Sequence, residues 1–173
     1  LFVDLKLAEN VQPGTFEIQF KSSGKVVETY RYELKKRVEK SAQRNGFNSS
    51  DVICLITPDR FVNGNPDNDA VDGMKEKPNR NDKDGRHGGD IQGMINSLDY
   101  LQEMGFTAIW VNPVLENNMT QVSYHGYSTT DFYKVDARYG SNEEYQKLNE
   151  ELDKRGMKLI MDMIFNHCGS EHW

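Results

Sequence analysis

The sequence predicts an α/β fold after about residue 50, preceded by a short β-rich segment. Three observations predict it. Apolar, strand-like runs alternate with helix-like stretches, a period of two runs through residues 14–34, and polar residues gather where the later strands end. Strands separated by helices pair in parallel through right-handed crossovers. The architecture is therefore an open doubly wound sheet or part of a (β/α)8 barrel.

The pattern of the β-rich start predicts an antiparallel hairpin. In GTFEIQF, Phe16, Ile18 and Phe20 alternate with polar residues, and an SSG turn leads into KVVETYRYEL. Two or three strands bury too little surface to be stable alone. We therefore expect residues 1–44 to be the last strands of a β-sandwich domain whose beginning is missing, and residues 45–173 to form a second domain.

The second part alternates strands and helices in a fixed order. Apolar runs at 52–58, 108–114 and 158–165 predict strands, the first of them buried on both faces. The stretch 90–106 places its apolar residues on one helical stripe that ends at Gly105. Ser141 and Glu144 form a capping box that begins a second helix, which ends at Gly156.

Polar residues mark the carboxyl ends of the three strands. No GxGxxG follows the first strand, which argues against a dinucleotide-binding fold. We expect the chemistry at the C-terminal edge of the sheet, as in barrel enzymes. The residues concerned are Asp59, Arg60, Asn112, Asp162, Asn166 and His167.

The connection after the first strand is far longer than the usual two to six residues. It is rich in the hard oxygen ligands that Ca²⁺ prefers, although its spacing is not that of an EF-hand. A merely polar, flexible loop is the alternative, and spacing alone does not choose between them.

Composition excludes several partners. The net charge of −6 comes without a clear basic cluster, so we expect no nucleic acid. No apolar run approaches the ~20 residues of a membrane span, so we expect a soluble chain without a membrane partner. Two cysteines, Cys54 and Cys168, are expected to be free thiols. The compartment stays unassigned: cytoplasmic, periplasmic and extracellular locations all fit.

Five motifs in one order resemble the α-amylase superfamily of glycoside hydrolases, and within it the neopullulanase, cyclomaltodextrinase and maltogenic amylase group. DMIFNH at 162–167 resembles the DxxxNH motif after the third barrel strand. The other four are PDRFVNGNPDND, HGGDIQG, GFTAIWVNPV and YHGYSTTDFYKVD. The resemblance implies that residues 45–173 are the first part of a catalytic (β/α)8 barrel, truncated after strand three, and that residues 1–44 end the extra β-sandwich domain of the group.

The resemblance also implies a calcium ion in the first long loop. The ligands that this resemblance implies are Asn63, Asn65, Asn68, Asp69, the carbonyl of Gly88, and Asp90. Asn65 stands where some relatives have Asp, and one fewer negative charge should weaken the site.

Sugar contacts follow from the same resemblance. It implies that Tyr127 stacks on the glucose ring at the cleavage site and that His167 donates to its hydroxyls as charge develops. Asp162 is expected to be a supporting carboxylate, Asn166 to brace the adjoining loop and His125 to shape the pocket. From the residues alone, a core tyrosine and a structural histidine would be the commoner interpretations.

The implied activity is retaining, double-displacement hydrolysis of α-glucosidic bonds in starch-derived α-glucan oligosaccharides. The implied nucleophile and acid/base lie beyond residue 173, so this chain by itself is expected to be inactive. Its unpaired barrel edges are expected to self-associate or to pair with the missing remainder of the barrel. Alternatives are a transglycosylase or isomerase of the same fold, or a non-catalytic carbohydrate-binding module.

Overall fold

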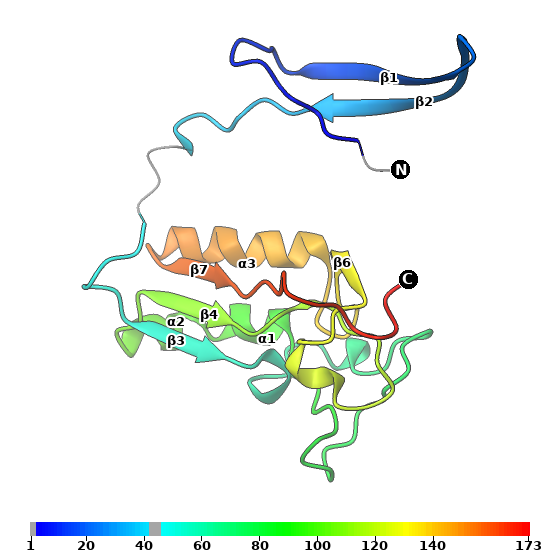
Figure 1. The fold of residues 1–173 in the computed structure, drawn as a ribbon. Helices are drawn as coiled ribbons and strands as arrows, with labels where there is room; N and C mark the ends of the chain where they lie inside the picture. The colour runs from blue at the N-terminus through cyan, green and yellow to red at the C-terminus, as the bar shows by residue number, and fades with distance from the viewer. Residues whose placement is uncertain (1–2, 42–45) are drawn as a thin grey trace. The chain divides into compact units, whose positions relative to one another are not determined.

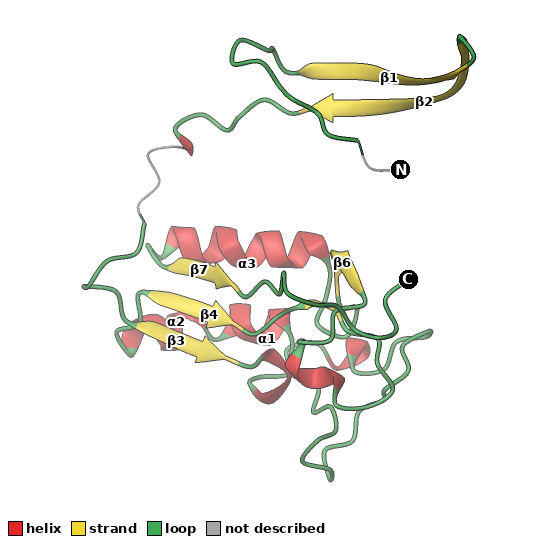
Figure 2. Cartoon of the chain, viewed as in Figure 1, coloured by secondary structure: helices red, strands yellow, loops and turns green. Residues whose placement is uncertain are grey.

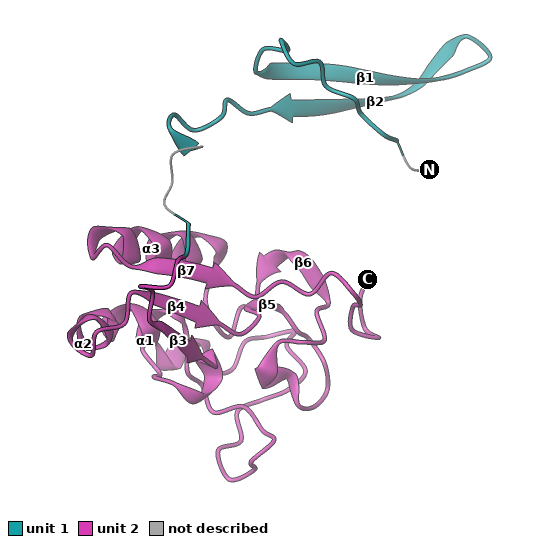
Figure 3. Ribbon diagram, turned by 60° about the vertical axis from the view of Figure 1, so that its left-hand side comes forward, with its two compact units in different colours: residues 1–47 teal, residues 48–173 magenta. Residues whose placement is uncertain are grey.

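A computed structural model describes residues 3–41 and 46–173 of the chain. The chain divides into two compact units, Leu1–Phe47 and Asn48–Trp173 (Figure 3). The domain boundary expected between residues 44 and 45 lies outside the described residues.

The first unit contains an antiparallel hairpin. Strands β1 (Gly14–Ser22) and β2 (Lys25–Leu34) pair along their whole length, with Phe16 opposite Tyr32 (Figure 1). The turn between them places Gly24 at a φ of +79°, a conformation that glycine adopts without strain. The hairpin forms as expected, and its assignment to a β-sandwich stays a prediction.

The second unit is built on a parallel three-stranded sheet. Its order is β3–β4–β7, with bounds Ile53–Ile56, Ala108–Val111 and Lys158–Met161 (Figure 2). The parallel pairing confirms the predicted α/β class. Each strand is shorter than its apolar run, because the last residues of every run turn into the loops at the carboxyl edge.

The stretch predicted as one helix is two short ones, which corrects the prediction. Helix α1 spans Ile91–Asn96 and α2 spans Leu98–Glu103. Between them the Ser97 hydroxyl donates to the carbonyl of Gly93 at 2.9 Å, and the Ser97 N–H bonds only three residues back, to Met94. A serine that bonds to its own helix in this way bends it, and Ser97 here interrupts it.

Helix α3 forms as predicted. It spans Asn142–Lys154, and the Ser141 hydroxyl accepts the Glu144 N–H at 3.2 Å as the cap. Gly156 ends the turn after it with a φ of +66°. The capping box and the glycine therefore fixed both ends of this helix.

One small element was not predicted. Strands β5 (Leu115–Glu116) and β6 (Asp131–Val135) form a short antiparallel ribbon between β4 and α3. Single 3₁₀ turns occur at Pro58–Arg60, Pro66–Asn68 and Ser123–His125. These elements all belong to the loops that follow β3 and β4, so they build the carboxyl edge of the sheet.

The core lies between the sheet and its helices. Ile109 and Val111 of β4 pack in one cluster with Leu98 of α2 and with Leu148 and Leu152 of α3. The opposite face is open: Leu55 is 61% exposed and Trp110, its partner in register, is 42% exposed. The expectation that the first strand is buried on both faces is therefore wrong for this chain. The helices cover one face only, so alternate strand residues meet solvent.

Within residues 3–41 and 46–173, every helix is too short or too polar to cross a bilayer.

Candidate functional site at the carboxyl edge of the sheet

Asp162 is the centre of a polar group at the end of β7. The Tyr127 hydroxyl donates to Asp162 Oδ2 at 3.0 Å, and the Trp110 indole N–H approaches the same oxygen at 3.3 Å. The tyrosine comes from the loop after β4, and the tryptophan from β4 itself. Three separate segments thus meet at one carboxylate. Burial, together with the hydrogen bond to Asp162 and its charge, raises the pKa of Tyr127, so this hydroxyl keeps its proton.

His167 is held by two contacts, one at each ring nitrogen. Its Nε2 lies 3.0 Å from the carbonyl oxygen of Tyr127, and its Nδ1 lies 3.2 Å from Asn166 Nδ2. A carbonyl oxygen only accepts, so the proton of a neutral ring belongs on Nε2, and Nδ1 accepts from the Asn166 amide. Asn166 therefore orients the ring so that its N–H points toward Tyr127.

His125 lies on the other side of Tyr127. Its Nδ1 accepts the backbone N–H of Tyr127 at 3.1 Å, and the two rings are 5.7 Å apart at an interplanar angle of 32°. Burial lowers the pKa of His125, against the opposing charge of Glu76. The neutral imidazole that results is the form that accepts this N–H.

A glycine between the two rings sets their directions. Gly126 has a φ of +82°, and a Cβ at this position would lie 2.0 Å from the carbonyl oxygen of Pro113. Only glycine fits such a contact. The chain therefore passes directly over the segment that follows β4, and Tyr127 emerges toward the end of β7.

Arg60 and Tyr124 add a cation–π pair at the same edge. The guanidinium carbon lies 3.8 Å from the ring centroid, and the guanidinium also donates to the carbonyl oxygens of Lys83 and Gly85. The sequence placed Arg60 after the first strand but gave no partner for it. Here it joins the long loop to the 3₁₀ turn Ser123–His125.

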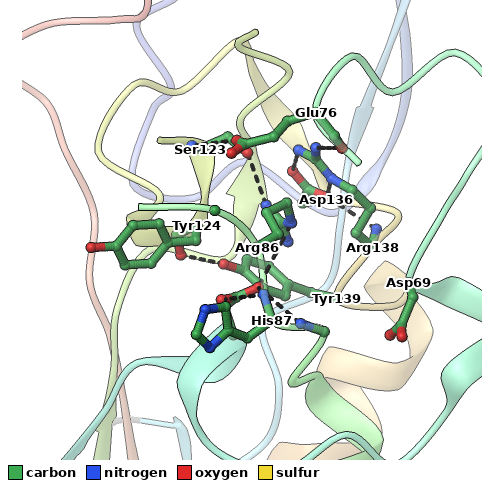
Figure 4. A network of polar contacts seen from close by, with 12 residues as sticks. Asp69, Glu76, Arg86, His87, Ser123, Tyr124, Asp136, Arg138 and Tyr139 are labelled. Atoms are coloured by element: carbon green, nitrogen blue, oxygen red, sulfur yellow. Dashed lines mark hydrogen bonds and ion pairs between the residues drawn. The ribbon is translucent and has the colours of Figure 1, made fainter. Parts of the chain in front are cut away.

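A buried ionic network supports these loops (Figure 4). Arg138 donates to both oxygens of Asp136, at 2.9 and 2.7 Å, and also to the carbonyl oxygens of Glu76 and Asn117. Burial by itself raises the pKa of Asp136, but the hydrogen bond from Arg138 and the charges of Arg86 and Arg138 lower it overall. The pair is thus ionised, and it ties the long loop to the segments that flank β5 and β6.

Arg86 is the second buried cation of the network. It is 2% exposed, donates to the Ser123 hydroxyl at 3.1 Å, and lies 3.8 Å from Asp59 and 4.6 Å from the Tyr139 ring centroid. In Figure 4 it lies between Ser123 and Tyr139. Sequence reasoning missed this network, because charges far apart in the chain carry no signal that they are buried together.

The proposed metal loop contains two buried oxygens without a partner. Asn63 Nδ2 donates to Asp69 Oδ1 at 2.7 Å, which leaves Asn63 Oδ1 unpaired, and Asn68 Oδ1 is unpaired as well. Gly88, with a φ of +89°, lies against the same carboxylate: an added Cβ would be 2.4 Å from Asp69 Oδ1. Unpaired buried amide oxygens beside a carboxylate are the donor set that Ca²⁺ accepts.

Asp90 and Asn65 have structural partners in the same loop. The Asp90 carboxylate caps α1 through the Gly93 N–H and also accepts the backbone N–H groups of Gly64 and Asn65. Asn65 Oδ1 accepts the Asp67 N–H at 3.3 Å. Over the described ranges, no three His, Cys, Asp or Glu side chains form a metal-binding group. The six expected ligands contain only two carboxylates, so their other oxygens come from amides and a carbonyl.

A cavity of about 600 Å³ adjoins the site. Asn166 and His167 belong to its wall, and most of the remainder is apolar, including Phe132, Phe165 and Trp173. Phe165 is 88% exposed and Trp173 is 80% exposed. The polar residues around Asp162 therefore lie next to a cavity whose aromatic side chains are largely exposed to solvent in this chain.

The structure brings the three expected sugar-binding residues and the two expected supporting residues into one chain of contacts. Tyr127 touches Asp162, His167 and His125 directly, and Asn166 touches His167. Their expected roles toward a sugar stay predictions. Trp110 was missed at this site, because its position inside an apolar run gave it the pattern of a core residue.

Comparisons with known proteins find two matching families and several similar proteins. Residues 55–173 match the family described as "Alpha amylase, catalytic domain", and residues 1–38 match "Cyclomaltodextrinase, N-terminal". A "Beta/alpha-amylase" from Paenibacillus polymyxa is 42% identical over 121 residues, covering 70% of this chain and 10% of that protein. "Neopullulanase 2" from Thermoactinomyces vulgaris is 38% identical over 122 residues, covering 69% of this chain and 20% of that protein.

A solved structure has the same fold. The crystal structure of an Anoxybacillus alpha-amylase matches with a TM-score of 0.60 and 44% identity, over 71% of this chain and 25% of that one. The chain thus spans a quarter or less of the length of each of these three proteins.

Proposed function

The chain belongs to the alpha-amylase family, and we propose that the protein carrying it hydrolyses α-glucosidic bonds of starch-derived oligosaccharides by a retaining double displacement. The observation that carries this proposal is the contact of Tyr127 with both Asp162 and His167 at the carboxyl edge of a parallel sheet. In barrel enzymes this edge is where substrates bind.

Tyr127 has the properties of a sugar platform. The apolar face of a pyranose packs well on an aromatic ring, and a ring held at both ends loses little freedom on binding. The Asp162 hydrogen bond fixes its hydroxyl, and His125 fixes its backbone. Tyr127 is therefore the residue we propose to stack on the glucose unit at the cleavage site.

His167 has the properties of a hydroxyl donor. Its Nε2–H points at the Tyr127 carbonyl, and Asn166 holds the opposite ring nitrogen. A bound sugar hydroxyl would take the place of this carbonyl as the acceptor. Donors fixed before the reaction stabilise the charge that develops in an oxocarbenium-like transition state. Asp162 is committed to Tyr127 and Trp110, which suits a supporting role better than that of a nucleophile.

We propose that Ca²⁺ binds in the long loop. The unpaired buried oxygens of Asn63 and Asn68 and the carboxylate of Asp69 support this, with the Gly88 carbonyl, Asn65 and Asp90 completing the set. Calcium there would supply a structural crosslink of a loop that has little regular secondary structure. It takes no part in the proton transfers.

The open face of the sheet supports a further partner. Leu55, Trp110 and Met161 leave apolar surface exposed, and the outer edges of β3 and β7 have no neighbouring strand among the described residues. Unpaired edges and apolar patches of this kind associate. We propose that further barrel strands, or a second copy of this chain, cover them. Sedimentation of the 173-residue chain at micromolar concentration tests this, and a stable monomer would contradict it.

The test of the activity is digestion of maltoheptaose by the protein carrying this chain, purified from its source, with products followed by chromatography. Cleavage to shorter oligosaccharides with retained anomeric configuration is the expected result. The isolated 173 residues should bind maltoheptaose without turnover. Products longer than the substrate would favour glucosyl transfer, and binding without cleavage by the source protein would favour a carbohydrate-binding module.

A further inference from the structure

Arg80 lies beside the carboxylate at the centre of the proposed calcium loop. Its Nη2 is 4.0 Å from Asp69 Oδ2, and its Nε donates to the carbonyl oxygen of His87 at 2.7 Å. The side chain of Arg80 is 61% exposed, whereas that of Asp69 is 22% exposed. A solvated cation therefore faces a largely covered anion.

The other oxygen of Asp69 also faces a hydrogen-bond donor. Asn63 turns its Nδ2 toward Asp69 Oδ1 and leaves its own Oδ1 unpaired. A metal would require the reverse, with the amide oxygen directed inward. One carboxylate oxygen thus accepts a hydrogen bond from an amide, and the other faces a guanidinium at 4.0 Å.

Space for an exchange exists beside these groups. Asn63, Arg80 and His87 line one polar cavity of about 280 Å³. The Asn63 amide can turn there, and Arg80 can move outward because most of its side chain already lies in solvent. The Nε bond to His87 keeps the guanidinium close to Gly88, the residue whose carbonyl is a proposed ligand.

We propose that Arg80 competes with calcium for Asp69 and that its positive charge sets the calcium affinity of this loop. The proposal rests on the calcium site proposed above and deepens it. Calcium binding must displace the guanidinium from Asp69 or tolerate a like charge a few ångströms away. Because the guanidinium lies mostly in solvent, water screens its charge, and removing it should tighten binding of a divalent ion a few ångströms away by only about threefold to tenfold.

The test is calorimetric titration of calcium into the metal-free 173-residue chain and its variants at low ionic strength. Arg80→Gln should bind calcium about threefold to tenfold more tightly than the parent chain. Arg80→Lys keeps the charge and should bind close to the parent. Lys83→Gln is the matched control, because Lys83 is an exposed cation of the same loop whose side chain has no recorded contact with Asp69. The gain in Arg80→Gln should shrink in high salt, which screens exposed charges.

Two outcomes would overturn the inference in different ways. If the parent binds calcium and Arg80→Gln gains no more than Lys83→Gln, Arg80 is a bystander while the calcium site stands. If neither the parent chain nor Arg80→Gln binds calcium, and Asp69→Asn gives the same calorimetric trace as the parent, the loop has no calcium site. The proposed competition with Arg80 is then also wrong.

Discussion

The Tyr127 hydroxyl and the Asp162 carboxylate, 35 residues apart in the chain, are joined by a hydrogen bond of 3.0 Å. One comes from the loop after β4 and the other from the end of β7. The orientation of the Tyr127 ring is therefore held by a residue at the end of a sheet strand and not by its own loop. Because the Trp110 indole shares the same carboxylate oxygen, the site is anchored to both strands.

The first prediction concerns this bond. In the active protein, Tyr127→Phe keeps the ring but loses the bond to Asp162. Since hydrogen bonds to charged groups contribute about 1.5–3 kcal/mol, kcat/KM for maltoheptaose should fall about tenfold or more. Tyr127→Ala, which also loses the ring, should fall further. Tyr100→Phe, on the exposed side of α2, is the control and should be unchanged. An equal kcat/KM for Tyr127→Phe and the parent protein would show that this hydrogen bond does not contribute to catalysis.

The second prediction is a pH dependence at His125. Burial lowers its pKa below the ordinary value of 6.5. Below pH 6.5 the unfolded chain therefore binds a proton that the folded chain does not, and stability falls as the pH is lowered through this range. His125→Asn retains an acceptor for the Tyr127 N–H and should flatten this part of the profile. Urea unfolding from pH 5 to pH 8, followed by fluorescence, measures it, since both tryptophans, Trp110 and Trp173, lie in the second unit.

The third prediction concerns the amino-terminal edge of the sheet. Asp51 accepts from Lys158 Nζ at 2.7 and 2.8 Å, and that bond, with a backbone bond from Asn48 and others, lowers the Asp51 pKa from 3.8 to about 2. A depressed carboxyl pKa stabilises the fold above pH 3.8 and loses that contribution as the pH falls toward 2. Asp51→Asn should therefore be less stable than the parent at pH 7 and similar to it at pH 2.

The control for this experiment is Asp99→Asn. Asp99 also pairs with a cation, Arg155, but its side chain is 77% exposed. Exposed pairs contribute little. A loss in Asp99→Asn as large as in Asp51→Asn would mean that net charge, rather than the Lys158 contact, explains the effect. Urea midpoints at the two pH values decide between these explanations.

The fourth prediction concerns the buried network. Asp136→Asn leaves the Arg138 guanidinium, 1% exposed, without its counter-charge. Breaking a buried ion pair by removing one partner costs about 3–5 kcal/mol, so the free energy of unfolding should drop by that order. Asp72→Asn, at an exposed loop position, should change it little. A small effect at Asp136 would show that water enters the network and screens it.

Local sequence signals predicted much of the fold. The capping box at Ser141 and Glu144 fixed the start of α3, and Gly105 and Gly156 take the positive φ values that helix ends require. These signals are readable because each depends on a few adjacent residues. The alternation in β1 and the apolar runs of the parallel strands are local in the same sense.

Two kinds of feature could not be predicted from the sequence: which backbone group a local polar side chain bonds, and which distant segments come together. The break at Ser97 depends on which carbonyl its hydroxyl reaches, and the β5–β6 ribbon depends on a pairing of short strands with little pattern of their own. Arg86 and Arg138 resemble ordinary surface cations in the sequence. Their burial follows from carboxylates and carbonyls that the fold brings in from other loops.

The sequence by itself determined the family and the order of the parallel strands and the helices around them, because short motifs and periodic patterns carry that information. Only the tertiary structure decided which groups touch. It joined Trp110 to Asp162, placed His167 Nε2 against the Tyr127 carbonyl oxygen, and set Arg80 near Asp69. The reason is physical: hydrogen bonds and ion pairs act over a few ångströms, and only folding brings residues that are far apart in the chain within that range.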